Sequence, residues 1–513
     1  MRLTGKCLLK DLRKKSSPNS MSSKRLVVKN SFYYLFSTIL INGMGFLLLP
    51  IVTKYLVPDD YGIINLIYSF SQVATYLISF SLYSSILRYY GDYENKDNLK
   101  RFIGTIQVFL AISGVIFLTG SFTFGEALST YLFNGIDYYP TVFIGLISLF
   151  FTVQLTFHHV ILQSRQSGKK LAIINIITFI ILVSSKLIFI VVYNMGALGV
   201  LLSQVITYGL YSVYMIYDLR KCDLIAFSFD LIILKKSLAY SIPIIPHNIS
   251  TMIAGYASRL FITNHHALGS VGLYSIAFQL TALIDVIQTS VNRAFQPWFF
   301  NKMRDKKINK EEILKLTDLL LITYTVLILV LGLASKEIVI VMTSQAYHDS
   351  WRIMPILLFG FALKSIYYFY VNIIMFYKKL TNQLFIATLA GSASDIILAF
   401  YLIKMFDRTG AALSFVLAKV IVITLIITIA KKSNTVGYSA SRMMQIIAPS
   451  LGFMYVGLYF SYTIFPDSVS CLDLVYKLSI MILYLLFLYT KHWQKYGVYI
   501  ISIAKERKIF ERN

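Results

Sequence analysis

Ionisable side chains lie inside long apolar stretches of this sequence, where a membrane makes charge expensive. Each such charge costs roughly 2.5–3.5 kcal/mol on insertion scales, so these residues usually face a bundle interior or a wet cavity. The basic ones are Lys54, Arg88, Lys186, Arg259, Arg293, Lys364, Lys419 and Lys477, and the acidic ones are Asp285, Asp318 and Asp395. The excess of positive charge predicts a cationic cavity that receives a phosphate group. Its expected substrate-binding residues are Arg259, Arg293, Lys364, Lys186 and Lys419.

Charges near the span ends have simpler interpretations. Lys54, Arg88 and Lys477 are expected to extend toward the lipid head groups. Asp318 lies close to a span end, where we expect it to be solvated.

Two carboxylates, Asp285 and Asp395, fall in the middle of apolar spans. They either pair with a cavity Lys or Arg or bind a coupling proton or sodium ion, and both interpretations stay open. Lys364 shares a helical face with Tyr367, Tyr368 and Asn372, which suits an anionic head group beside a sugar. Apart from a coupling ion, no cofactor or metal is expected.

The stretch from residue 237 to 300 must position several of these groups. It reads as two long apolar helices joined by a polar turn. One helix face carries Asn248, Thr251, Gly255 and Arg259, and one face of the next carries Thr281, Asp285, Gln288 and Asn292. Two polar stripes on membrane helices predict a lined transport path. Pro243 and Pro246 interrupt the first helix, either as a static kink or as a gate.

Composition places the chain among polytopic membrane proteins of the all-α class. Of its 513 residues 57% are hydrophobic and only 14% are charged, and the mean hydropathy is +0.67. A soluble protein would carry about a quarter charged residues. The net charge of +24 fits basic cytoplasmic loops and also an anionic substrate. Neither a nucleotide-binding motif nor a nucleophile elbow is found, so we expect no enzyme and no nucleic-acid partner.

Fourteen apolar spans are predicted, at residues 31–56, 61–88, 102–124, 139–163, 171–193, 196–217, 238–263, 271–300, 314–335, 353–377, 381–404, 409–430, 443–465 and 474–490. With the N-terminus inside, most Lys and Arg residues fall in the inside segments. The predicted outside loops hold only Lys336, Arg352, Lys404 and Arg408. Both basic tails, 1–30 and 491–513, are therefore expected in the cytoplasm.

An internal repeat of about 210 residues is predicted from three landmarks. Tyr61–Gly62 matches Val271–Gly272, Lys169–Lys170–Leu171 matches Lys378–Lys379–Leu380, and Gly199 matches Gly410. The expected organisation is a six-span lobe over 31–217, a second over 238–430 in the same orientation, and two added spans over 443–490.

Several longer stretches resemble one family. They include KYLVPDDYGIINLIYSFSQ, SLYSSILRYY, SLAYSIPIIPHNIS, GSVGLYSIAFQL, NRAFQPWF, YKKLTNQLFIATLAG and RTGAALSFVLAKVI, and they cover residues 25–430. In order and spacing they resemble the polysaccharide-export branch of the multidrug/oligosaccharidyl-lipid/polysaccharide exporter superfamily, the O-antigen and capsule repeat-unit flippases of bacteria.

The resemblance implies two six-helix lobes around a central cleft in the bacterial inner membrane. It also implies ATP-independent alternating access that moves an undecaprenyl-pyrophosphate-linked oligosaccharide, with membrane lipids, a polysaccharide polymerase and a chain-length regulator as partners. Where many relatives read Ser-Asp-Arg, this chain has Ala257–Ser258–Arg259, which puts cation coupling at that acid in doubt. The alternatives are a multidrug/cation antiporter of the same superfamily, a membrane glycan polymerase or ligase, and a lipid scramblase or structural scaffold.

Overall fold

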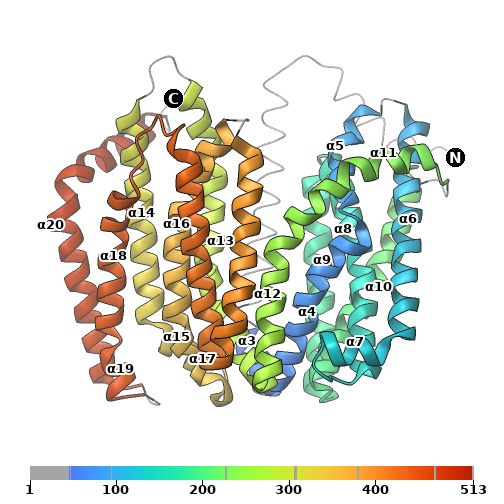
Figure 1. The fold of residues 1–513 in the computed structure, drawn as a ribbon, viewed down its shortest axis with the longest axis horizontal. Helices are drawn as coiled ribbons and strands as arrows, with labels where there is room; N and C mark the ends of the chain where they lie inside the picture. Colours follow the sequence, from blue (N-terminus) through green and yellow to red (C-terminus); the bar gives the residue numbers. More distant parts are fainter. Residues whose placement is uncertain are drawn as a thin grey trace. The chain divides into compact units, whose positions relative to one another are not determined.

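A computed structural model describes residues 46, 48–93, 95–225, 228–304, 309–377, 380–466 and 469–510, without the side chains of 381–382 and 492–510. Every regular element in these ranges is a helix (Figure 1). The predicted tail 1–30 and most of the first predicted span lie outside the described residues. By its internal contacts the chain divides into two compact units, Met1–Gly272 and Leu273–Asn513. The predicted lobes, with their boundary between residues 217 and 238, stay a prediction.

The first unit is a helical bundle with its own buried core. Its helices are α3 (Leu49–Tyr55), α4 (Pro58–Ser79), α5 (Leu82–Tyr89), α6 (Lys96–Thr123), α7 (Gly125–Leu132), α8 (Phe143–Ser164), α9 (Gly168–Leu187), α10 (Gly196–Lys221), α11 (Leu231–Ser241) and α12 (Ile245–His265). Helices α8 and α10 pack against each other, and α12 packs along α4. The core includes Leu66, Phe102, Phe157 and Leu201, all fully buried.

The second unit has a separate core around α16. Helix α13 (Leu268–Arg304) enters it from the first unit, and the others are α14 (Lys310–Leu333), α15 (Ser335–Met342), α16 (Met354–Phe376), α17 (Thr381–Lys431), α18 (Ala440–Gly457), α19 (Tyr459–Thr463) and α20 (Cys471–Phe510). Phe299, Leu321, Ile373 and Tyr484 are buried in this core. Helix α16 packs mainly on α17, and α14 packs on α18.

Within the described ranges, nine helices are long and apolar enough to cross a membrane, or ten if the bent pair α4–α5 forms one span. Helix α17 contains two of the predicted spans. Its backbone leaves helical geometry between them, at Phe406 and Asp407. The polytopic all-α class is confirmed, whereas the count of fourteen spans stays a prediction.

Ion pairs join loops that the charge pattern assigns to one side of the membrane. In the first unit Lys96 and Lys100 from one predicted inside segment contact Asp223 from another. In the second unit Arg408 contacts Asp349, and both belong to predicted outside loops. These contacts join loops that the charge pattern places on a common side, and which side faces the cytoplasm stays a prediction.

Three of the repeat landmark glycines, Gly62, Gly272 and Gly410, mark close approaches of backbone, whereas Gly199 meets the Cβ atoms of Phe189 and Met195. Within the first unit a Cβ on Gly62 would overlap the Leu268 carbonyl, and a Cβ on Gly272 would overlap the Pro58 carbonyl. Gly410 likewise approaches the Leu402 carbonyl. Only glycine allows such contacts. The lysine landmark includes Lys378 and Lys379, which lie outside the described residues.

Candidate functional site

An ion pair between α13 and α16 forms the centre of the candidate site. Lys364 Nζ lies 2.8 Å from Asp285 Oδ1, and the two side chains are 24% and 28% exposed. Tyr368 Oη donates to the same carboxylate oxygen at 2.9 Å, and its ring lies 5.7 Å below the Lys364 ammonium. Thr289 lies 2.8 Å from Tyr368 Oη and can donate to it. The lysine and the carboxylate are thus held together, and both side chains stay partly exposed.

The polar stripe of α13 faces α16 over much of its length. Asn372 Nδ2 donates to Asn292 Oδ1 at 2.8 Å, and buried Gln288 donates to the Phe361 carbonyl at 3.1 Å. Part of the predicted path is therefore a polar helix–helix interface. Such hydrogen bonds hold apolar helices in register where water is excluded. Asp285 lies on the same stripe but is 28% exposed, so its carboxylate remains accessible.

The second predicted carboxylate, Asp395, lies on α17 with Lys419. The two residues interact electrostatically, and Lys419 also lies within electrostatic range of Lys364 and Asp285. The Lys419 ammonium lies 4.8 Å from the Phe415 ring centre. Asp395 Oδ1 is buried and accepts no hydrogen bond within the described ranges. Two lysines and two carboxylates of the prediction therefore form one mixed-charge cluster in the second unit.

The other predicted cations lie outside this cluster. Arg293 is exposed on α13. In the first unit Arg259 Nη1 donates to the Gly255 carbonyl at 2.9 Å, one turn earlier on α12, and its charge acts on Tyr61. Lys186 is half-buried on α9, in the same unit. The predicted set is thus divided, with three basic residues in the second unit and two in the first.

The two prolines mark a change of helix type. A 3-10 turn, Ile242–Ile244, separates α11 from α12, with Pro243 inside it and Pro246 in the first turn of α12. Proline is tolerated at a helix start because no hydrogen bond is lost there. The interruption is therefore a joint between two helices, and its role as a gate stays a proposal.

Two predictions at the span ends are wrong. Lys477 is 5% exposed and pairs with Glu337 at 2.6 Å and with Asp473 at 3.0 Å, so it does not extend to lipid head groups. Asp318 is 2% exposed and pairs with Arg442 from α18, so it is not solvated. Glu337 lies 140 residues from Lys477 and Arg442 lies 124 residues from Asp318, and the local sequence does not reveal these two partners. Asp473, one helical turn before Lys477, is the local partner.

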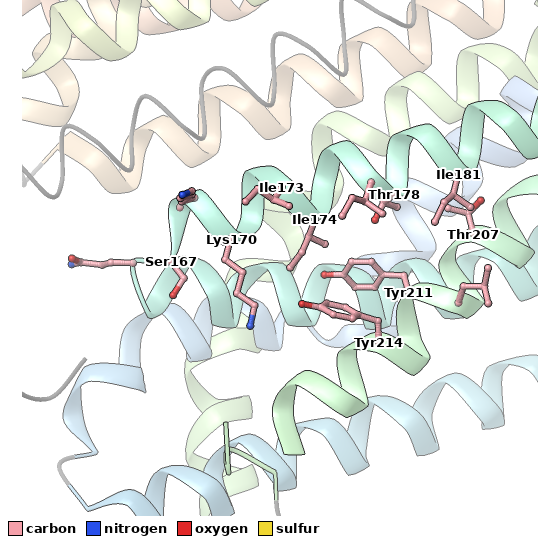
Figure 2. A pocket seen from close by; sticks show the side chains of 14 residues that line it. Ser167, Lys170, Ile173, Ile174, Thr178, Ile181, Thr207, Tyr211 and Tyr214 are labelled. Carbon is pink, nitrogen blue, oxygen red and sulfur yellow. The ribbon is translucent and has the colours of Figure 1, made fainter. Parts of the chain in front are cut away.

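A buried polar cluster in the first unit was missed by sequence reasoning. His158 on α8 is fully buried, with Nδ1 2.7 Å from Tyr211 Oη and Nε2 3.2 Å from Asp218 Oδ2. Lys170 contacts the other oxygen of Asp218. Figure 2 shows Lys170 from α9 near Tyr211 and Tyr214 from α10. The only sequence signal is a histidine–acid pair 60 residues apart, which periodicity cannot connect.

Comparison with known proteins places these features in context. The model of a family described as polysaccharide biosynthesis protein matches residues 27–303. Lsg locus protein 1 of Haemophilus influenzae is 23% identical over 395 residues, which cover 75% of this chain and 94% of that protein.

Two solved structures with a similar fold are a flippase and a multidrug transporter. The lipid II flippase MurJ in an inward closed conformation has a TM-score of 0.68 and 15% identity, over 90% of this chain and 99% of its own. An inward-facing multidrug resistance MATE transporter of the MOP superfamily has a TM-score of 0.59 and 13% identity, over 80% of this chain and 96% of its own. At these identities the likeness shows the fold.

Proposed function

The chain belongs to the polysaccharide biosynthesis protein family, and from that premise we propose that it is a bacterial flippase for a polyprenyl-pyrophosphate-linked oligosaccharide. The resemblance predicted from the sequence motifs is thereby confirmed for the family and for the exporter fold. The proposed cargo is a repeat unit of an O-antigen, capsule or exopolysaccharide. It crosses the cytoplasmic membrane by alternating access without ATP, and both tails of the protein lie in the cytoplasm.

The Lys364–Asp285 pair is the observation that supports this cargo. Both side chains are partly exposed, so an arriving pyrophosphate can compete with Asp285 for the Lys364 ammonium. A phosphate group offers more acceptor oxygens than one carboxylate and forms strong charge-assisted hydrogen bonds. Lys419 adds a second positive charge within electrostatic range. Arg259, Arg293 and Lys186 are proposed to bind the same anion at other stages of transport.

Release of Asp285 from Lys364 offers a route to ion coupling. While paired, the carboxylate contacts the Lys364 ammonium and accepts a hydrogen bond from the Tyr368 hydroxyl. Once the pyrophosphate takes the lysine, the carboxylate loses its counter-charge and gains affinity for a proton or a sodium ion. We propose that uptake of this ion accompanies cargo binding, with Asp395 and Lys419 as a second exchangeable pair.

A multidrug antiporter of the same fold is the second candidate. Its cationic substrates require carboxylates that are available to them. Here Asp285 contacts a lysine and Asp395 interacts electrostatically with one, which disfavours a cationic substrate. Partners such as a polymerase and a chain-length regulator belong to the flippase proposal.

Transport in proteoliposomes tests the proposal. We expect the protein to move a fluorescent polyprenyl-pyrophosphate oligosaccharide, and we expect Lys364→Ala, Arg259→Ala and Arg293→Ala to reduce the rate at least about tenfold, the effect of losing roughly 1.4 kcal/mol of anion stabilisation. Lys404→Ala is the matched control, because Lys404 is an exposed lysine on the same helix as Lys419. Failure to move this lipid, together with movement of a small cationic dye against a proton gradient, would establish the antiporter instead.

A further inference from the structure

A groove of about 830 Å³ runs between α9 and α10 in the first unit (Figure 2). Its apolar wall includes Ile173, Ile177 and Ile181 from α9 and Leu210 from α10, and the side chains of Thr178, Thr207, Tyr211 and Tyr214 also line it. The four aliphatic side chains are between about a third and more than half exposed. An apolar hollow that stays open within its own unit is expected to hold an apolar chain.

The length of the groove matches one leaflet of a bilayer. It extends along α9 from Lys169 to Ile181. At about 1.5 Å per residue this stretch of helix spans roughly 18 Å. The hydrocarbon core of one leaflet is about half of 30 Å. The groove thus accommodates a chain that reaches from the head-group level to the bilayer centre.

One end of the groove is basic. Ser167, Lys169 and Lys170 line it, in a segment that the charge pattern places on the cytoplasmic side. The first turn of α9 carries no acidic residue, and the Ser167 side chain makes no capping hydrogen bond. Lys170 contacts Asp218, whereas the exposed Lys169 lies beside the positive end of the helix and repels it, and an anion placed there relieves the repulsion.

We propose that this groove binds an anionic glycerophospholipid of the cytoplasmic leaflet. Its phosphate lies against Ser167, Lys169 and Lys170, and one acyl chain follows the isoleucines of α9. A polyprenyl-linked sugar is disfavoured, because its chain is several times longer than one leaflet. This site is separate from the cluster at Lys364 and does not depend on which cargo the protein moves.

The bound lipid also connects to the buried cluster of the first unit. Its phosphate shares Lys170 with Asp218, and Asp218 contacts the buried ring of His158. When the phosphate draws Lys170 partly away from Asp218, less positive charge remains near the His158 ring. An anionic lipid can thereby influence the packing of α8, α9 and α10.

Native mass spectrometry of the full-length protein tests the site. The probes are phosphatidylglycerol and phosphatidylcholine with identical acyl chains, and a polyprenyl pyrophosphate without sugar. Wild type is expected to retain phosphatidylglycerol roughly fivefold better than phosphatidylcholine. Lys169→Glu should abolish this preference, and Ile177→Trp, which fills the groove, should lower retention of both phospholipids. Both positions are exposed, so the variants are expected to fold, and their melting temperatures check this.

Lys221→Glu is the matched control, because Lys221 ends α10 on the same side and does not line the groove. It should leave the preference unchanged. Equal loss in Lys169→Glu and Lys221→Glu would overturn the proposal in favour of unspecific charge attraction. Equal retention of the two phospholipids by wild type would also overturn it. Displacement of phosphatidylglycerol by the polyprenyl pyrophosphate in wild type, but not in Ile177→Trp, would assign the groove to the cargo.

Discussion

Gly62 and Gly272 occupy equivalent places in one symmetric contact. Gly62 approaches the carbonyl of Leu268, which lies four residues before Gly272. Gly272 approaches the carbonyl of Pro58, which lies four residues before Gly62. The offset between the two glycines and between the two carbonyls is the same 210 residues on which the repeat was predicted. The beginnings of two helices, α4 and α13, thus approach each other in a paired way at the predicted offset, and the six-span repeat stays a prediction.

This contact predicts a strict requirement for glycine. Gly62→Ala and Gly272→Ala each place a methyl group on a backbone carbonyl, and we expect each to destabilise the protein by about 1–3 kcal/mol, as overpacking does. Thermal unfolding in detergent measures the effect. Gly120→Ala is the control, because nothing lies within 4 Å of a Cβ at that helical position. Equal melting temperatures for all three variants would contradict the close approach.

The Lys364–Asp285 pair predicts a separation of stability from transport. Lys364→Met leaves Asp285 without its counter-charge, and we expect a loss of about 1–3 kcal/mol, less than for a fully buried pair. The double variant Lys364→Met/Asp285→Asn should recover most of this stability and remain inactive. Thermal unfolding and the flipping assay distinguish the two effects. Recovery of transport by the double variant would show that the lysine only neutralises Asp285.

A structural role is predicted for the charges at Asp473. This fully buried carboxylate contacts Lys477 at 3.0 Å, Lys336 at 3.8 Å and the Ser461 hydroxyl at 2.7 Å. Asp473→Ala leaves two buried lysines with fewer compensating charges, so we expect a loss of about 3–5 kcal/mol. Lys404→Ala, an exposed change, should leave the unfolding temperature unaltered. A small effect of Asp473→Ala would mean that water reaches this cluster.

An acid-sensitive connection is predicted at Asp223. Its pKa is lowered below the ordinary carboxyl value, first by the hydrogen bond from Lys100 and then by that from Lys96. Because the folded pKa is the lower one, the contribution is complete above the unfolded pKa and is lost as the pH falls through the folded pKa. Asp223 and its two lysine partners are partly exposed, so Asp223→Asn should cost no more than about 1 kcal/mol at pH 7. Unfolding curves of wild type and variant should converge on acidification, and a constant difference would contradict this origin.

How much could be predicted from the sequence depends on how far apart in the chain the interacting residues lie. The helices at most spans, the break at Pro243 and the shared face of Lys364, Tyr368 and Asn372 follow from local periodicity. Contacts between residues that are far apart in the chain do not follow from local periodicity. Asp318 with Arg442, and His158 with Asp218, depend on how finished helices dock, and one sequence holds no signal for that. From the local sequence Asp318 is therefore predicted to be solvated, whereas the folded protein pairs it with Arg442.

The turn inside α17 fixes more than the direction of the chain. Gly391 approaches Val422, Gly410 approaches Leu402, and Asp395 interacts with Lys419, so the two arms run antiparallel about Phe406–Asp407. Asp395 and Lys419 each lie twelve residues from Asp407. One inserted residue would rotate the second arm by about 100° and shift it by about 1.5 Å. Insertions, deletions and epitope tags should therefore be tolerated poorly at this turn, because the length of the turn determines whether Asp395 and Lys419 come together.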